Sequence, residues 1–249
     1  KGDINDKERQ GIVENSCHGD CGACSGFYTA NTMACLLEVM GLMLPNGSSN
    51  MSASTEKRVE LINSGQTIKN LLEKDIKPLD IMTRESFLNA VKFLTLIGGS
   101  TNGVIHLLAI AKTAGVQLTL DDFKEFEHLP VLTNMKPHGT NVMDDLNRIG
   151  GTSTLIKYLI DYGILDGDCL TITGKTLKEN TNDSQIVDLD SNIILPYEKP
   201  FKKSSHINIL YKNITPQGTN SKIYSKNKKL NNKKINNNKK KEIKKKKKT

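Results

Sequence analysis

The sequence lacks any apolar run long enough to cross a membrane. A membrane-spanning helix needs about 20 consecutive apolar residues, and no stretch of the 249 residues approaches that length. The first ten residues, KGDINDKERQ, are polar and contain no apolar signal-peptide core. We therefore expect neither a membrane span nor a secretory leader in this sequence.

Cysteine is too scarce and too clustered for a disulfide framework. There are five cysteines, an odd number, and three of them fall within eight residues. Small secreted domains instead use an even set of cysteines to staple a core that is too small. The pattern predicts a reducing compartment, cytoplasmic or organellar, and not a secreted protein.

Apolar residues make up only 37% of the chain, and the cause is local. Residues 226–249 contain thirteen lysines and one glutamate, a net charge of +12, which leaves −4 for residues 1–225 out of the total of +8. The basic pI is thus a property of this segment, so it predicts no specific nucleic-acid groove on the rest. A segment of this composition buries too little apolar surface to offset its chain entropy, and we expect residues 226–249 to be disordered.

The cysteine cluster points to a metal. Cys17, Cys21 and Cys24 are interleaved with glycines and are followed by a helical pattern of apolar residues. We expect Thr29 or Asn31 to cap that helix. A thiol just ahead of a helix N-terminus is favoured as thiolate, the form that binds metal, and Cys24 is the best placed of the three.

The spacing C-x3-C-x2-C by itself leaves several interpretations open. It fits an iron–sulfur or zinc half-site, although no second C-x2-C pair exists to complete a closed zinc site. Radical enzymes that hold a cubane cluster and S-adenosylmethionine use the same spacing. Three thiols that merely pack in a turn are the structural alternative.

Downstream, the pattern predicts helices separated by glycine turns. Thr83 should cap a helix that stops at Gly98-Gly99, and residues 100–102 should open another that stops at Gly115. A Gly-Gly turn that leads into a helix offers backbone N–H groups to an anion, although an ordinary helix–turn–helix has the same sequence pattern. Within the second helix, His106 is expected to be a packed core histidine.

The last third of the chain predicts strands and a linker. Residues 169–173, 206–211 and 221–224 alternate like strands, and Cys169 is expected to be a strand residue and not a ligand. Residues 178–185, KENTNDSQ, read as a polar linker.

Several blocks of the sequence resemble one enzyme family. The segment SCHGDCGACSGFYTANTMACLLEVMGLMLPNGSS resembles the cysteine signature of the dihydroxy-acid and phosphogluconate dehydratases. It departs from that signature at His18, where proline is usual, at Phe27, where methionine is usual, and in one extra residue between Cys17 and Cys24. The blocks around GGSTN (residues 98–102), around KPHG (residues 136–139) and in HINILYKNITPQGTNSKI are similar to later blocks of the family, in family order.

This resemblance implies a fold and a division of the chain. The fold class is α/β: residues 1–195 would form an α/β dehydratase domain that lacks its N-terminal part. Residues 196–225 would open a truncated, β-barrel-like C-terminal domain, and residues 226–249 would be the disordered tail. Full-length members imply a homodimer.

The resemblance also implies an activity and its site. The expected reaction is that of dihydroxy-acid dehydratase, which converts 2,3-dihydroxy-3-methyl acids to 2-oxo acids on the valine and isoleucine routes. Cys24 would be a ligand of an iron–sulfur cluster, 2Fe–2S or 4Fe–4S, and Ser100, Thr101 and Asn102 would line the substrate pocket. The ligands of Mg2+, the other cluster cysteines and the serine base are expected outside this chain, which predicts an incomplete or inactive fragment.

Three alternatives remain from the sequence. Another sugar-acid dehydratase of the same family would share the Cys24 ligand. A radical S-adenosylmethionine enzyme would need Cys17, Cys21 and Cys24 together. A non-catalytic protein that binds anionic polymers through its lysine tail would show strongly salt-dependent binding.

Overall fold

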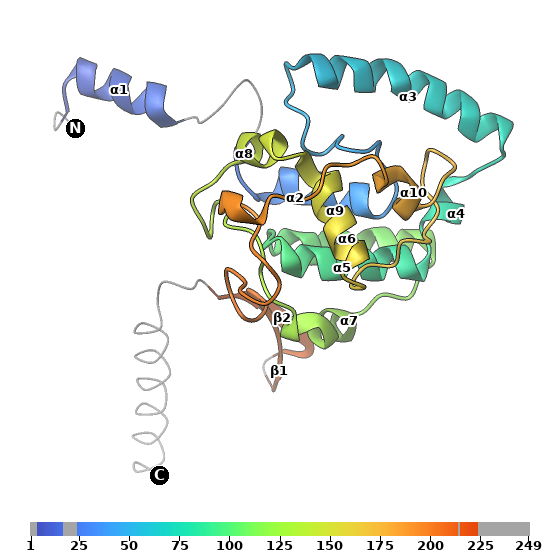
Figure 1. Ribbon diagram of the computed structural model, residues 1–249. Helices are drawn as coiled ribbons and strands as arrows, with labels where there is room; N and C mark the ends of the chain where they lie inside the picture. Colours follow the sequence, from blue (N-terminus) through green and yellow to red (C-terminus); the bar gives the residue numbers. More distant parts are fainter. Residues whose placement is uncertain (1–3, 17–23, 214, 224–249) are drawn as a thin grey trace, which may run out of the picture.

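A computed structural model describes residues 4–16, 24–213 and 215–223 of the chain (Figure 1). These residues form mainly helices, with one two-stranded sheet near the end of the described chain. The helices are α1 Asp6–Ser16, α2 Thr29–Val39, α3 Thr55–Glu73, α4 Pro78–Ile81, α5 Arg84–Leu96, α6 Asn102–Ala114, α7 Leu120–Glu125, α8 Met143–Arg148, α9 Gly151–Asp161 and α10 Leu177–Thr181, with 3-10 turns at Phe126–His128 and Leu189–Ser191. The strands are β1 Ile207–Lys212 and β2 Thr215–Lys222.

Helix α2 lies at the centre of the hydrophobic core. It packs against α5, α6 and α9, and its residues Cys35, Leu36 and Val39 are fully buried. Helices α8 and α10 pack on α9, and α7 lies beside β1 at the opposite end of the molecule (Figure 1). The apolar residues of α2 recur at three- and four-residue spacings, so one continuous face is available for this packing.

The helices around the glycine turns form as the sequence predicts. Thr83 accepts a hydrogen bond from the Ser86 N–H at the start of α5, and Gly115 ends α6 in the left-handed conformation with φ 72°. Gly99 has no room for a side chain, since an added Cβ would lie 2.7 Å from Leu94 Cδ1. The α5–α6 turn therefore requires glycine for close packing.

Three expectations about local structure are wrong. Residues 169–173 form no strand but a tight turn around Gly174, held by hydrogen bonds from the Thr171 N–H and hydroxyl to the Lys175 carbonyl. The linker expected at 178–185 is partly helical, because Thr176 and Glu179 form a capping box that starts α10. His106 lies on the exposed side of α6 and is not a core residue.

The strand expected at 206–211 is confirmed, and β2 begins earlier than the predicted 221–224. The strands pair antiparallel, with Ile207 opposite Lys222 and Leu210 opposite Thr219. The β1 residues Ile207 and Ile209 are buried in the same core as the helices. The described residues are thus mixed helix and sheet, consistent with the α/β class. The truncated second domain and the division at residue 195 stay predictions, and the tail 226–249 lies outside the described residues.

A buried carboxylate joins α2 to the start of α9. Glu38 is 3% exposed. Its Oε1 accepts hydrogen bonds from the Asn46 N–H (2.9 Å) and the Ser153 hydroxyl (2.8 Å), and its Oε2 accepts from the N–H (3.0 Å) and hydroxyl (2.6 Å) of Ser48. Burial raises the pKa of Glu38 above its ordinary value, while the hydrogen bonds from Ser48 and Ser153 oppose that rise.

None of the helices within the described ranges is both long and apolar enough to cross a membrane.

The Glu38 contacts predict a large stability effect. Glu38→Ala should lower the free energy of unfolding by about 3–5 kcal/mol, because several buried donors lose their acceptor. Glu38→Gln should cost less, since its amide oxygen still accepts. Urea denaturation followed by circular dichroism measures both. Glu73→Ala, at an exposed site on α3, is the matched control, and equal midpoints for Glu38→Ala and the control would refute the role of this network.

Candidate functional site

The cysteine turn, residues 24–28, is held against the loop that follows α7. The Phe27 N–H donates to the Lys136 carbonyl (2.7 Å), and the Met143 N–H donates to the Ser25 carbonyl (2.7 Å). A Cβ on Gly26 would lie 2.7 Å from the Lys136 carbonyl oxygen, so only glycine allows this approach. Cys24 itself is exposed, at the surface end of this fixed turn.

Asn31 fixes the turn from within α2. Its side-chain amide donates to the carbonyls of Cys24 (2.6 Å) and Gly26 (2.8 Å). The expectation that Thr29 or Asn31 caps α2 is wrong: Tyr28 occupies the N-cap position and makes no side-chain capping bond. Asn31 instead positions the backbone that carries the thiol.

The starts of α2 and α6 meet beside this turn. The Asn102 amide donates to the Thr29 hydroxyl (2.7 Å), which lies 3.5 Å from the Ser100 hydroxyl. The Ser100 N–H donates to the Thr32 hydroxyl (3.0 Å). We call Thr29, Ser100 and Asn102 the polar rim; Thr101, at the N-cap position of α6, is half-buried next to it.

The Gly-Gly turn is not a free anion cradle. The N–H groups of Gly98 and Gly99 donate to the Thr95 and Leu94 carbonyls. Those of Asn102 and Gly103 donate to the hydroxyl and carbonyl of Ser100. With these four donors used, the turn resembles an ordinary helix–turn–helix connection more than an anion cradle.

The β1–β2 hairpin covers the same turn with basic residues that sequence analysis did not single out. His206 is fully buried and its Nε2 lies 2.6 Å from the Gly99 carbonyl oxygen, which Lys222 Nζ also approaches at 3.4 Å. The His138 ring packs edge-on against the His206 ring, with 5.1 Å between centroids. A histidine at the start of a predicted strand gave no signal of this contact.

Burial lowers the pKa of each of these basic groups. Burial lowers the pKa of His206 to about 3 and that of His138 to about 4, with a further decrease from the neighbouring lysines. Burial also lowers the pKa of Lys222 to about 8. His206 is therefore neutral at pH 7, and its Nε2–H donates to Gly99.

The other described thiols are placed unlike Cys24. Burial raises the pKa of Cys35 and of Cys169 to about 12, which disfavours the thiolate. Cys169 lies in a turn, where its sulfur accepts from the Asn89 amide (3.5 Å). Cys17 and Cys21 lie outside the described residues. Within the described ranges, no three histidine, cysteine or acidic side chains gather as a metal site.

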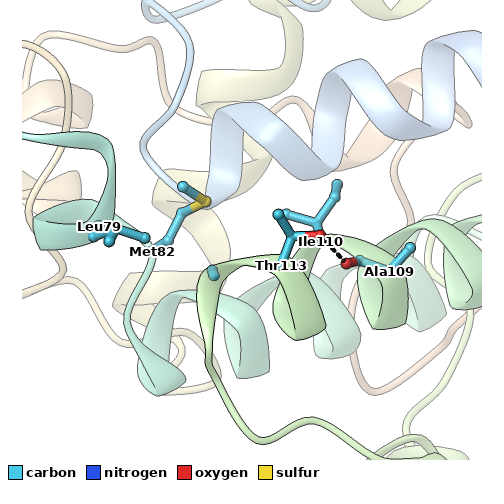
Figure 2. A pocket seen from close by; sticks show the side chains of 6 residues that line it. Leu79, Met82, Ala109, Ile110 and Thr113 are labelled. Atoms are coloured by element: carbon cyan, nitrogen blue, oxygen red, sulfur yellow. Dashed lines mark hydrogen bonds between the residues drawn. The ribbon is translucent and has the colours of Figure 1, made fainter.

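Two further features are not part of this site. Asp122 pairs with Arg84 and caps α7 through Thr119, and Asp121 accepts a hydrogen bond from the Tyr211 hydroxyl (2.8 Å), so both acids make structural contacts. A groove of about 310 Å3 between α4 and α6 is lined mainly by apolar groups, including Leu79, Met82 and Ile110 (Figure 2). It offers little polar chemistry.

The arrangement around Cys24 can bind a ligand, but by itself it offers little further chemistry. It presents one accessible thiol on a fixed backbone, and a rim of two hydroxyls and one amide that can hydrogen-bond hydroxyl or carboxylate groups. None of these groups is an evident base.

Comparison with known proteins gives a consistent result. The family model described as dihydroxy-acid/6-phosphogluconate dehydratase N-terminal matches residues 1–180. A dihydroxy-acid dehydratase of Francisella tularensis subsp. novicida is 50% identical over 226 residues, which are 90% of this chain and 40% of the relative. Dihydroxy-acid dehydratases of Lactococcus lactis subsp. lactis (47%) and Cytophaga hutchinsonii (45%) match over 90% of the chain and 40% of their own lengths. The chain thus spans about two fifths of these relatives.

The buried imidazoles predict an acid-sensitive fold. Their folded-state pKa values of about 3 and 4 lie below the ordinary value of 6.5, so the unfolded chain binds more protons between pH 6.5 and 3. Stability should therefore be fully present above pH 6.5 and fall as the pH drops toward 3, by at most about 1.4 kcal/mol per pH unit for each group.

Urea midpoints measured across this pH range test the prediction. The double variant His138→Gln/His206→Gln should show a flatter profile. His106→Gln, on the exposed side of α6, serves as the control. Parallel profiles for the double variant and the wild type would contradict the assignment.

Proposed function

Since the chain belongs to the dihydroxy-acid/6-phosphogluconate dehydratase family, we propose that it is part of a dihydroxy-acid dehydratase. The reaction removes the C2 proton and the C3 hydroxyl of a 2,3-dihydroxy-3-methyl acid as water. The resulting enol becomes a 2-oxo acid. The observation that carries the proposal is the identity of 45–50% with relatives of that name over 90% of this chain. Family membership also favours this proposal over the radical-enzyme interpretation.

The site contacts support specific roles. Cys24 is proposed as a cluster ligand, because it is the exposed thiol on a backbone fixed by Asn31 and Gly26. Ser100 and Asn102 are proposed to hydrogen-bond the substrate from the polar rim, with Thr101 beside them. Thr29 would orient the Asn102 amide.

The described residues do not by themselves complete a cofactor site. A cluster of the proposed iron–sulfur type needs several thiolates that converge. Among the described thiols only Cys24 is exposed, and the other two are buried with raised pKa values. Cluster binding, the choice of 2Fe–2S or 4Fe–4S, and Mg2+ are therefore proposed for the complete enzyme, with other ligands from outside the described residues.

Three further features remain proposals. The substrate is a small dihydroxy acid. The second candidate is a sugar acid, the substrate of a sugar-acid dehydratase of the same family. The complete enzyme is a homodimer in the cytoplasm or an organelle. The β1–β2 hairpin opens a second domain in the complete enzyme.

A chimera tests the roles. Residues 1–225 would replace the matching segment of the Lactococcus lactis relative. The chimera should produce 2-oxo acid from 2,3-dihydroxy-3-methylbutanoate. Cys24→Ser should abolish iron incorporation and activity, while Cys17→Ser and Cys35→Ser should retain most of both. Iron content and visible absorption provide the readout. Equal iron loss in all three variants would contradict the special role of Cys24.

Ser100→Ala and Asn102→Ala in the same chimera should raise KM and lower kcat/KM about tenfold or more while iron content is unchanged, because each removes one hydrogen bond to the substrate. His128→Ala, at an exposed turn, is the control. Unchanged kinetics for both rim variants would refute substrate contact.

Residues 1–249 alone should not catalyse the dehydration, because the described residues offer one exposed thiol and no evident base. Anaerobic reconstitution with iron, sulfide and magnesium, followed by the same assay, measures this. Turnover in the usual enzyme range of roughly 1–1000 per second would overturn the claim.

A further inference from the structure

One peptide group, between Gly99 and Ser100, is anchored at both of its polar atoms. Its carbonyl oxygen accepts a hydrogen bond from His206 Nε2 (2.6 Å), and Lys222 Nζ lies 3.4 Å from the same oxygen. Its N–H donates to the Thr32 hydroxyl (3.0 Å). Thr32 belongs to α2, His206 directly precedes β1 and Lys222 ends β2, so segments far apart in sequence meet on this group.

The local chain does not fix the orientation of this peptide group. A peptide group is a rigid plane, and the backbone dihedrals on either side set its rotation. Glycine leaves those dihedrals unusually free, and two glycines precede Ser100, with Gly98 in the left-handed conformation at φ 63°. The hydrogen bonds at the two ends of the plane therefore decide its rotation, and the plane carries the Cα of Ser100.

Both anchors are buried. Thr32 and His206 are each 0% exposed. Helix α2 also approaches the turn closely, since a Cβ on Gly99 would lie 2.9 Å from Thr32 Cγ2. Within the described chain, the His206 ring makes one hydrogen bond, the bond to Gly99, so a replacement of the ring removes a single one. Because water does not compete at these buried ends, the two bonds hold the plane in one orientation.

We propose that Thr32 and His206 are positioning residues for substrate binding, and that they act through the peptide group that precedes Ser100. The inference rests on the proposed function, in which the Ser100 hydroxyl contacts the dihydroxy acid from the polar rim. This hydroxyl accepts from the Asn102 N–H (3.3 Å) and lies 3.5 Å from the Thr29 hydroxyl. A rotation of the peptide plane would move the hydroxyl away from these neighbours and misplace its contact with the substrate.

Hydrogen exchange in residues 1–249 tests the anchoring without an activity assay. His206→Leu and Thr32→Val each remove one anchor. The backbone amides of residues 98–103 should exchange several-fold faster in both variants, while those of α9 keep their wild-type rates. His206→Gln keeps a donor and Thr32→Ser keeps the hydroxyl, so both should remain close to the wild type.

Thr181→Val, at a buried threonine of α10, is the matched control and should leave the exchange of residues 98–103 unchanged. If His206→Leu does not fold, His206→Asn takes its place, because the shorter amide does not reach the carbonyl. Unchanged exchange at residues 98–103 in both anchor variants overturns the proposal.

The chimera described above tests whether the anchors act on the substrate. His206→Leu and Thr32→Val should each lower kcat/KM about tenfold, chiefly through KM, with iron content unchanged, and His206→Gln and Thr32→Ser should stay within about twofold of the wild type. In a Ser100→Ala background, the same two variants should lower kcat/KM by less than about twofold more, because the contact on which they act is already absent.

The outcomes separate this inference from the proposed function. A tenfold loss that persists in the Ser100→Ala background overturns the proposal, since the anchors would then act by another route. An inactive wild-type chimera refutes the proposed function and with it the substrate role, whereas hydrogen exchange decides the anchoring by itself.

Discussion

The described fold depends on the hydrogen bonds that one buried carboxylate, Glu38, accepts. The two carboxylate oxygens of Glu38 accept hydrogen bonds from the loop after α2 and from the first turn of α9. These two segments are more than a hundred residues apart in sequence. A buried carboxyl without such partners would cost several kcal/mol. The hydrogen bonds therefore fix where α9 lies on α2, and α2 in turn carries the cysteine turn at its other end. Helix α2 therefore belongs both to the hydrophobic core and to the candidate site.

Much of this fold can be predicted from the sequence, because the residues that start, stop and orient its helices act locally. Thr83 caps α5, Gly115 ends α6, and the apolar spacing of α5 matches its buried face. Failures occurred where a longer-range contact decided the outcome. Residues 169–173 alternate like a strand, yet among the described residues they make only an isolated bridge, from Leu170 to Thr176, and the Ile172 N–H donates to the Gly41 carbonyl of the turn after α2.

The candidate site was only partly predictable. Cys24 and residues 100–102 were singled out from their motifs, and the structure places Ser100 and Asn102 at the start of α2, the helix that follows the cysteine turn. The sequence did not predict that the Asn31 amide donates to the carbonyls of Cys24 and Gly26. An asparagine near the start of a helix is equally typical of a helix cap. His206 was missed altogether. Its partner, the Gly99 carbonyl, has no sequence signature.

That last contact also determines when the Gly99 turn is completed. The His206–Gly99 hydrogen bond spans 107 residues, whereas α5, the turn and α6 are continuous in the chain. A polypeptide emerges from the ribosome in sequence order. The two helices are thus available to pack long before the hairpin exists, and the carbonyl of Gly99 stays open to water in the interval. The turn beside the polar rim is consequently among the last parts of the described fold to be enclosed during synthesis.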